Sequence, residues 1–244
     1  MFYEPGKTPH NLPYDPFKSC VIPRPIGWIS TISPSGKSQN LAPYSQFQNL
    51  TFDPPYVMFS ANQTLNGTRK DTVINAESTG VFCWNMATWD LRHAVNLSAE
   101  QVEYGVDEFG LAGVTAVPST VLGEPKCPMV AESPIRFECT YHSTIRLPGN
   151  PPMGTVDVVI GRVVGVHIAD GVLDESGKID VLKIRPIARC GYYNYTVINE
   201  LFDMVVPGDP RMLRGLEGSS EGNRKTLEEN RLGAQGKEEE SSEK

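Results

Sequence analysis

Three short strand-like stretches between residues 24 and 60 constrain the fold of this chain more than any other feature. Residues 26–33 carry β-branched side chains in nearly continuous order, and residues 34–37 have the composition of a tight turn, in which Gly36 can take a positive φ. This pattern predicts a β-hairpin with strands near 26–33 and 40–48. A third, apolar strand is expected near 56–61.

The second of these strands has an unusual composition for a β-strand. Pro43 cannot donate a hydrogen bond to a neighbouring strand, and Ala42 and Ser45 fill little space. Such residues suit an edge or a bulge that another group approaches closely. Two interpretations remain open at this point: an irregular edge strand and a ligand site.

The stretch from residue 60 to residue 72 is rich in phosphate-binding chemistry. It contains three threonines, a serine, two asparagines, a glycine and the pair Arg69-Lys70 at the end of the apolar strand. Hydroxyl donors, backbone N–H groups and cations are what a phosphate requires. Asp71 is a suitable capping residue for a short helix over 72–78. The alternative is a solvated polar loop.

The rest of the chain predicts a mainly β domain followed by a polar tail. Strands are expected over 81–85, 135–145 and 155–169, and a helix with Thr88 as its cap is expected over 88–97. The chain is expected to divide into a Pro-rich extended segment (1–20), one domain (21–210) and a disordered tail (215–244). The tail has too few apolar residues to offset its chain entropy by burial.

Composition and charge exclude several classes of protein. A chain of 244 residues with 39% hydrophobic content can bury one substantial core. The net charge of -7 disfavours nucleic acid and anionic membranes as partners. Five scattered cysteines, an odd number, favour reduced thiols in a cytoplasmic protein. No apolar run approaches the ~20 residues that a membrane span needs.

Several short motifs resemble known nucleotide-binding or metal-binding motifs but lack residues that those sites require. Gly36-Lys-Ser resembles the end of a nucleotide-binding loop, but Thr31 stands where that loop needs a glycine. No Gly-x-Gly-x-x-Gly sequence opens a βαβ unit, so a Rossmann domain is not predicted. Cys139 and His142 are three apart, which on a strand places them on opposite faces, and no metal site is predicted.

The order and spacing of these segments resemble the flavin reductase-like family, which has the FMN-binding split-barrel fold and includes flavoredoxin. The matching pieces are Arg24-Pro-Ile-x-x-Ile-Ser-Thr, Gly36, Asn40-Leu-Ala-Pro-Tyr-Ser, Asp53-Pro-Pro-x-Val-x-Phe-Ser and Lys70-Asp-Thr-x-x-Asn. Segments 103–113, 161–168 and 185–189 are also similar. The resemblance implies a split β-barrel with a few short flanking helices.

The resemblance also implies an FMN site and a homodimer. It places the phosphate against Ser60, Thr68, Arg69 and Lys70, with Thr72 nearby, and the rest of the cofactor along Asn40, Leu41, Ala42 and Ser45. Trp28 is expected either to stack on the flavin ring or to be a core strand residue. His142 and His167 are candidate substrate contacts, because the resemblance places barrel strands near the flavin.

The leading functional hypothesis is an oxidoreductase that takes hydride from NADH or NADPH onto FMN and passes electrons to free flavin or another acceptor. The flavin carries this chemistry, so no catalytic side chain is assigned. One alternative is a carrier that holds FMN tightly and is reduced by a protein partner. Another is a split-barrel scaffold that has lost the cofactor.

Overall fold

The computed structural model describes residues 1–204 and 207. The chain divides into two compact units, Met1–Glu200 and Leu201–Lys244, and every described helix and strand belongs to the first. The predicted tail over 215–244 lies outside the described residues. No described helix is long and apolar enough to cross a membrane.

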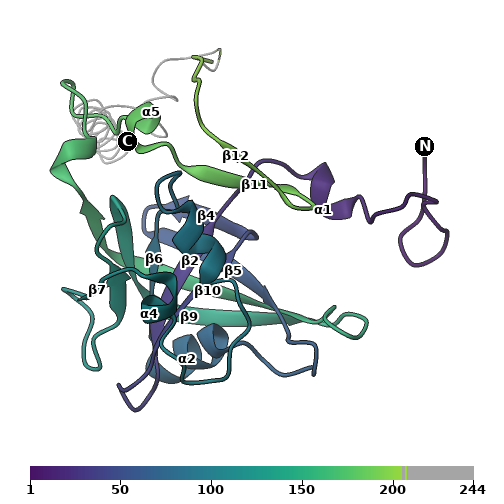
Figure 1. Cartoon of the computed structure of the whole chain (residues 1–244), viewed down its shortest axis with the longest axis horizontal. Helices are drawn as coiled ribbons and strands as arrows, with labels where there is room; N and C mark the ends of the chain where they lie inside the picture. The colour runs from purple at the N-terminus through teal and green to yellow at the C-terminus, as the bar shows by residue number, and fades with distance from the viewer. Residues whose placement is uncertain (205–206, 208–244) are drawn as a thin grey trace, which may run out of the picture. The chain divides into compact units, whose positions relative to one another are not determined.

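A seven-stranded antiparallel sheet forms the body of the first unit (Figure 1). In spatial order its strands are β3 (Gln39–Tyr44), β2 (Gly27–Ile32), β6 (Val81–Asn85), β9 (Ile135–Leu147), β10 (Val156–Ile168), β5 (Pro55–Asn62) and β4 (Phe47–Phe52). The two outer strands, β3 and β4, are consecutive in the chain and are joined by Ser45 and Gln46 alone. This short link brings the two ends of the sheet together, and the sheet curls into a barrel that stays open between β3 and β4, which are not hydrogen-bonded neighbours.

The predicted hairpin at the start of the sheet is confirmed. β2 and β3 pair antiparallel, and residues 34–36 form the turn, with Gly36 at a φ of 72°. Every residue of β2 is buried. Adjacent side chains of β2 enter different cores: Ile29 packs inside the barrel with Phe59 and Phe82, whereas Trp28 packs with α3 and α4 on the other face. The continuous apolar run thus reflects burial on both faces.

The longest strands, β9 and β10, form a hairpin that extends to the right in Figure 1. Its register shifts twice, so that His142 of β9 and Val164 of β10 are extra residues without a cross-strand partner. Bulges of this kind bend a strand and change the face on which side chains lie. The structure also confirms the expected strands, as β9, β10, β5 and β6, over 135–145, 155–169, 56–61 and 81–85.

Short helices flank the barrel, and one of them differs from expectation. The predicted helix over 72–78 is α2 (Asp71–Thr79), which ends at Gly80 in the left-handed conformation. The expected helix over 88–97 is wrong in its first part, since only α3 (Arg92–Leu97) is helical. Thr88 forms a bridge with Pro186, and Trp89 N donates to Arg185 O at 2.9 Å. These long-range backbone contacts hold residues 88 and 89 outside the helix.

The remaining elements are small and lie around the barrel. Two further sheets form, of three strands in the order β1, β11, β12 and of two strands, β7 and β8. The bounds are β1 (Arg24–Pro25), β7 (Ala116–Pro118), β8 (Pro128–Val130), β11 (Ile187–Gly191), β12 (Asn194–Val197), α1 (Phe17–Cys20), α4 (Glu108–Ala112), η1 (Asp170–Val172) and α5 (Val181–Ile184).

Close packing inside the barrel makes Gly161 a sensitive position. A Cβ added there would collide with the aromatic ring of Phe82, which is itself fully buried. We expect Gly161→Ala to lower the free energy of unfolding by about 1–3 kcal/mol, the usual cost of overpacking a core. Gly123→Ala is the matched control, because a Cβ there meets no atom within 4 Å. Urea unfolding of both variants checks this, and equal stabilities would contradict it.

Candidate functional site

A cavity of about 150 Å³ lies where the outer edge of β3 meets the start of α2. Four of the residues predicted from the sequence line it: Asn40 and Ala42 from β3, Lys70 just before α2, and Thr72 in its first turn. Glu108 of α4 and the segment 98–102 line it as well. The tertiary structure therefore brings together two stretches that the sequence analysis treated separately.

The outer edge of β3 explains its unusual composition. β3 pairs with β2 on one side only, so every second N–H points away from the sheet. The N–H of Leu41 points outward and donates to Oε2 of Glu108 at 2.7 Å. Pro43 lies two residues further along, on the same outward side, where a missing N–H leaves no hydrogen bond unmade.

A buried polar network holds β3, α2 and α4 together at the cavity. Oε2 of Glu108 also accepts a hydrogen bond from Nδ2 of Asn40. Oδ1 of Asn40 accepts from the hydroxyls of Thr72 at 2.7 Å and Thr31 at 3.1 Å. The hydroxyl of Tyr44 in turn donates to Thr72 at 2.8 Å. Because every member has a partner, the network positions the three elements with little freedom.

The charges at this cavity are shifted toward neutrality. Burial, together with the nearby Asp71 carboxyl, raises the pKa of Glu108 to about 7, despite the opposing effect of its hydrogen bonds. Burial also raises the pKa of Asp71 and lowers the pKa of Lys70. The carboxyl groups of Asp71, Glu100 and Glu108 line the cavity, and near neutral pH the raised pKa of Glu108 lowers its negative charge.

Two predicted residues are buried beside the cavity instead of lining it. Trp28 is fully buried and its Nε1 donates to the hydroxyl of Ser98 at 2.9 Å, and Ser98 lines the cavity. The side chain of Leu41 packs in the same core cluster as Trp28. Of the two roles expected for Trp28, the structure therefore places it in the core. Its hydrogen bond positions Ser98.

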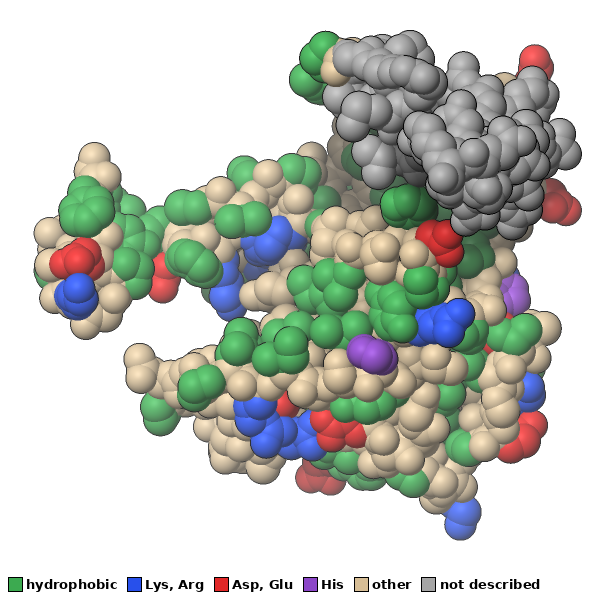
Figure 2. All heavy atoms as spheres, turned by 180° about the vertical axis from the view of Figure 1, so that it is seen from behind, with side chains coloured by type: hydrophobic (Ala, Val, Ile, Leu, Met, Phe, Trp, Pro, Cys, Tyr) green, Lys and Arg blue, Asp and Glu red, His purple; other side chains and the backbone are tan. Residues whose placement is uncertain are grey.

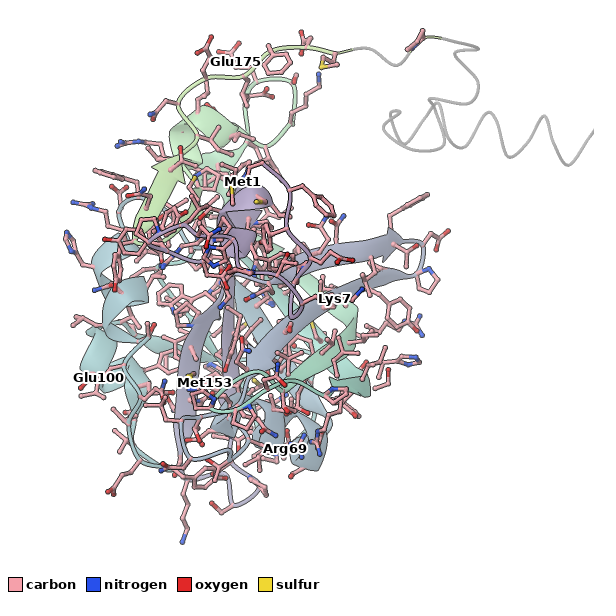
Figure 3. The ribbon with its side chains drawn as sticks, turned by 90° about the vertical axis from the view of Figure 1, so that its right-hand side faces the viewer. Met1, Lys7, Arg69, Glu100, Met153 and Glu175 are labelled. Carbon is pink, nitrogen blue, oxygen red and sulfur yellow. The ribbon has the colours of Figure 1, made fainter. Side chains whose placement is uncertain are left out.

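The other predicted phosphate contacts lie outside this cavity. Arg69 pairs with Glu77 and with the buried Asp157, and Figure 3 shows it well apart from Glu100, which lines the cavity. The Thr68 hydroxyl lies 2.6 Å from that of Thr64. Ser60 N donates to Gln46 O, beside Ser45 at the junction of β3 and β4. The structure thus separates Lys70 from Arg69, its neighbour in the chain.

The two candidate histidines also lie elsewhere. His142 is the exposed bulge residue of β9 and its ring forms a T-shaped pair with that of Tyr56, whereas Cys139 is buried. His167 Nε2 lies 2.6 Å from Oε1 of Glu138. Neither histidine lines the cavity.

Glu138 is a buried residue that the sequence analysis did not single out. It is completely buried and accepts hydrogen bonds from the backbone N–H groups of Thr120, Val121 and Leu122. Burial raises its pKa, but these donors and His167 outweigh that effect and hold the pKa below its ordinary value. Glu138 therefore anchors the loop at 120–122 to the barrel. The alternation of the strand gives no signal for its burial, because Glu138 falls in the polar phase of the pattern with Arg136 and Thr140.

Glu108 was missed for a different reason. Its segment, 103–113, entered the sequence analysis only through the family resemblance. In the structure Asp107 caps α4 by accepting from the N–H groups of Phe109 and Gly110, and an acid in the first turn after such a cap is an ordinary feature of a helix. Only the approach of α4 to β3 gives this carboxyl its role.

Comparison with known proteins identifies the family. The model of the flavin reductase like domain matches residues 19–193. The chain belongs to the flavin reductase-like family. An uncharacterized family relative from Aquifex aeolicus is 34% identical over 175 residues, which are 71% of this chain and 84% of that protein.

Solved structures agree with this assignment to the flavin reductase-like family. Nitrilotriacetate monooxygenase component B from Bacillus cereus is 30% identical, with a TM-score of 0.75 over 84% of this chain and 98% of that one. Flavoredoxin of Desulfovibrio vulgaris (Miyazaki F) has a TM-score of 0.61 at 19% identity over 84% of this chain and 97% of that one, and shows the fold alone. The expected split barrel is confirmed, and the chain falls among flavin-related oxidoreductases.

The raised pKa of Glu108 makes stability depend on pH. In the unfolded chain Glu108 loses its proton near its ordinary pKa of 4.5, but in the folded protein only near about 7. Between these values the folded state binds more protons than the unfolded state, so stability falls as pH rises. Glu108→Gln does not titrate, and its amide oxygen can replace Oε2 as the acceptor for Leu41 and Asn40.

We therefore expect the stability of Glu108→Gln relative to the natural chain to increase from about pH 5 to about pH 8, where it levels off. Urea unfolding of both proteins across this range measures the difference. Because all other titrating groups are shared, they largely cancel. Parallel pH profiles would show that burial does not perturb Glu108.

Proposed function

We propose that this chain binds FMN at the cavity between β3 and α2 and acts as an NAD(P)H-dependent flavin reductase. The observation that supports this proposal is the convergence of Lys70 and the start of α2 with the outer edge of β3. In the proposed reaction NADH or NADPH reduces the bound flavin, and the electrons pass to free flavin or another acceptor.

The residues at the start of α2 fit a phosphate group. No side chain makes a capping hydrogen bond at this helix, so the cap expected from Asp71 does not form. The N–H of Val73 donates to Lys70 O, which leaves the N–H of Thr72 for an anion. Lys70, half-buried beside them, supplies the cation. The raised pKa of Glu108 reduces the repulsion that this carboxyl group would otherwise exert on a phosphate.

The size of the cavity limits what one chain can hold. Ligand sites usually have volumes of about 300–1,000 Å³, whereas this cavity has about 150 Å³. It therefore suits the phosphate end of FMN, and the remainder needs further surface. A homodimer would provide that surface, and the family resemblance favours one.

An exposed apolar region suits such a dimer. Tyr14 and Phe17 near the N-terminus and Tyr193 after β11 are 68%, 66% and 94% exposed. They border a hollow of about 880 Å³. Figure 2 shows a deep recess between the N-terminal segment and the β9–β10 hairpin. Exposed apolar groups of this kind are typical of surfaces that associate.

The residues of this chain bind and orient the cofactor and hold one proton. Bound FMN supplies the capacity to accept a hydride and to release electrons singly or in pairs. Lys70 and the start of α2 bind its phosphate, and the backbone of Asn40 and Ala42 lies against the rest. The network through Asn40 and Thr72 keeps β3 in place. Oε2 of Glu108 is occupied by two N–H donors, so the proton that this carboxyl holds below about pH 7 resides on Oε1.

The visible absorption spectrum of the protein with FMN, taken without oxygen, tests the proposed activity. We expect a bound-flavin band that bleaches on addition of NADH or NADPH, and the more effective nucleotide identifies the co-substrate. A bound flavin that neither nucleotide reduces would favour a carrier reduced by a protein partner. A protein that binds no flavin would overturn the assignment of the cavity.

Replacing Lys70 tests the phosphate site. Loss of a charge-assisted hydrogen bond costs about 1.5–3 kcal/mol, so Lys70→Ala should weaken FMN binding about tenfold to a hundredfold. Quenching of FMN fluorescence measures the affinity. Lys37→Ala removes the same charge from the exposed hairpin turn and should leave the affinity unchanged. Equal affinity in the two variants would remove Lys70 from the site.

A further inference from the structure

A second cavity, of about 310 Å³, lies between α3 and β12 and shares no lining residue with the proposed flavin cavity. Its volume falls at the lower end of the ~300–1,000 Å³ that is usual for small-ligand sites. A dinucleotide or a whole flavin nucleotide is too large for it. None of its lining residues is among the candidate site residues predicted from the sequence.

The lining combines an apolar floor with aromatic rings and one guanidinium group. Val95, Ile187 and Val197 provide the aliphatic surface, and Tyr195 and Trp89 provide the rings. Flat aliphatic and aromatic surfaces of this kind accept a planar ring more readily than a bulky or strongly hydrated group.

Arg92 is held in place at this cavity. Its Nη1 donates to the carbonyl oxygen of Trp89 at 2.7 Å, and its Cζ lies 4.0 Å from the centre of the Trp89 ring. These contacts use one of its five N–H donors and one face of its plane. Among residues 1–204 no carboxylate lies within 4.0 Å of Arg92, so its charge has no ion-pair partner there.

Two more arginines add positive charge nearby. Cζ of Arg185 lies 5.3 Å from the centre of the same Trp89 ring, and Cζ of Arg189 lies 4.6 Å from that of Tyr195. Neither forms an ion pair within the described part of the chain. Neither of these two arginines lines the cavity, and Arg92 is the cation that does. A guanidinium group that lacks a carboxylate partner is suited to bind an anionic group from a ligand.

We propose that this cavity binds a small aromatic carboxylate, with the ring against the apolar floor and the carboxylate on Arg92. The apolar and aromatic lining suits a planar ring, and Arg92 suits an anionic group. A mononucleotide also has a planar ring and an anionic group. The volume favours a single-ring acid over a nucleotide. The site does not depend on the proposed flavin cavity, so flavin binding and this inference stand or fall separately.

Trp89 provides a direct signal for binding. It is 37% exposed, whereas Trp28 and Trp84 are 0% and 7% exposed, so a ligand in this cavity should alter the emission of Trp89 alone. Benzoate is the probe, and calorimetric titration of the full chain measures its affinity independently of fluorescence. We expect saturable binding with a fluorescence change that Trp89→Phe abolishes.

Variants at Arg92 test the role of the guanidinium group. Arg92→Met should weaken benzoate binding tenfold or more, and Arg92→Lys should retain part of the affinity because it keeps the charge without the planar donor set. Arg162→Met, at an exposed position of β10, is the matched control and should bind benzoate normally. Unchanged affinity in both Arg92 variants would overturn the proposal.

Two further ligands define the chemical class. Benzamide has the ring without the charge and should bind at least tenfold more weakly than benzoate, because the anion carries the contact with Arg92. AMP tests the nucleotide alternative. Tighter binding of AMP than of benzoate would overturn the assignment to aromatic carboxylates, as would the absence of any heat of binding or fluorescence change with benzoate.

Discussion

The hydrogen bond from Leu41 N to Glu108 is the contact on which the organisation of this molecule depends. β3 ends the sheet, and its outward N–H groups need an acceptor that no strand provides. Glu108 supplies this acceptor from α4 and simultaneously holds Asn40. Through Asn40 the same carboxyl reaches Thr72 and the start of α2. One buried acid thereby determines how two helices sit against the open edge of the barrel.

Burying that acid has an electrostatic consequence for the cavity beside it. Removal from water raises the pKa of Glu108 into the neutral range, and the neighbouring Asp71 contributes in the same direction. Near neutral pH Glu108 then adds less negative charge to a cavity that Asp71 and Glu100 also line. The burial of Glu108 therefore both satisfies the outer edge of β3 and reduces the negative charge of the cavity.

Much of the fold was accessible from the chain because local rules and burial agree. The turn at Gly36 and the strands of the barrel follow from turn chemistry and apolar pattern. Thr88 shows where this approach fails. Its capping chemistry favoured a helix start, but a bridge to Pro186, almost a hundred residues away, outweighs a local preference of about 1 kcal/mol. Lys70 and Arg69 show the same limit at the site, since adjacent residues point to different partners.

The amino-acid sequence was enough to predict the family, the mainly β architecture and two candidate ligand-binding segments, 40–45 and 60–72, the second of which has phosphate-binding chemistry. These properties depend on residue type and on spacing over a few residues, and both can be read from the sequence. Packing of the whole chain was needed to place Lys70 at the cavity and Trp28 in the core, and to join α4 to β3 through Glu108. Burial, ion pairing and pKa depend on which distant residues meet, and that is set by packing of the whole barrel.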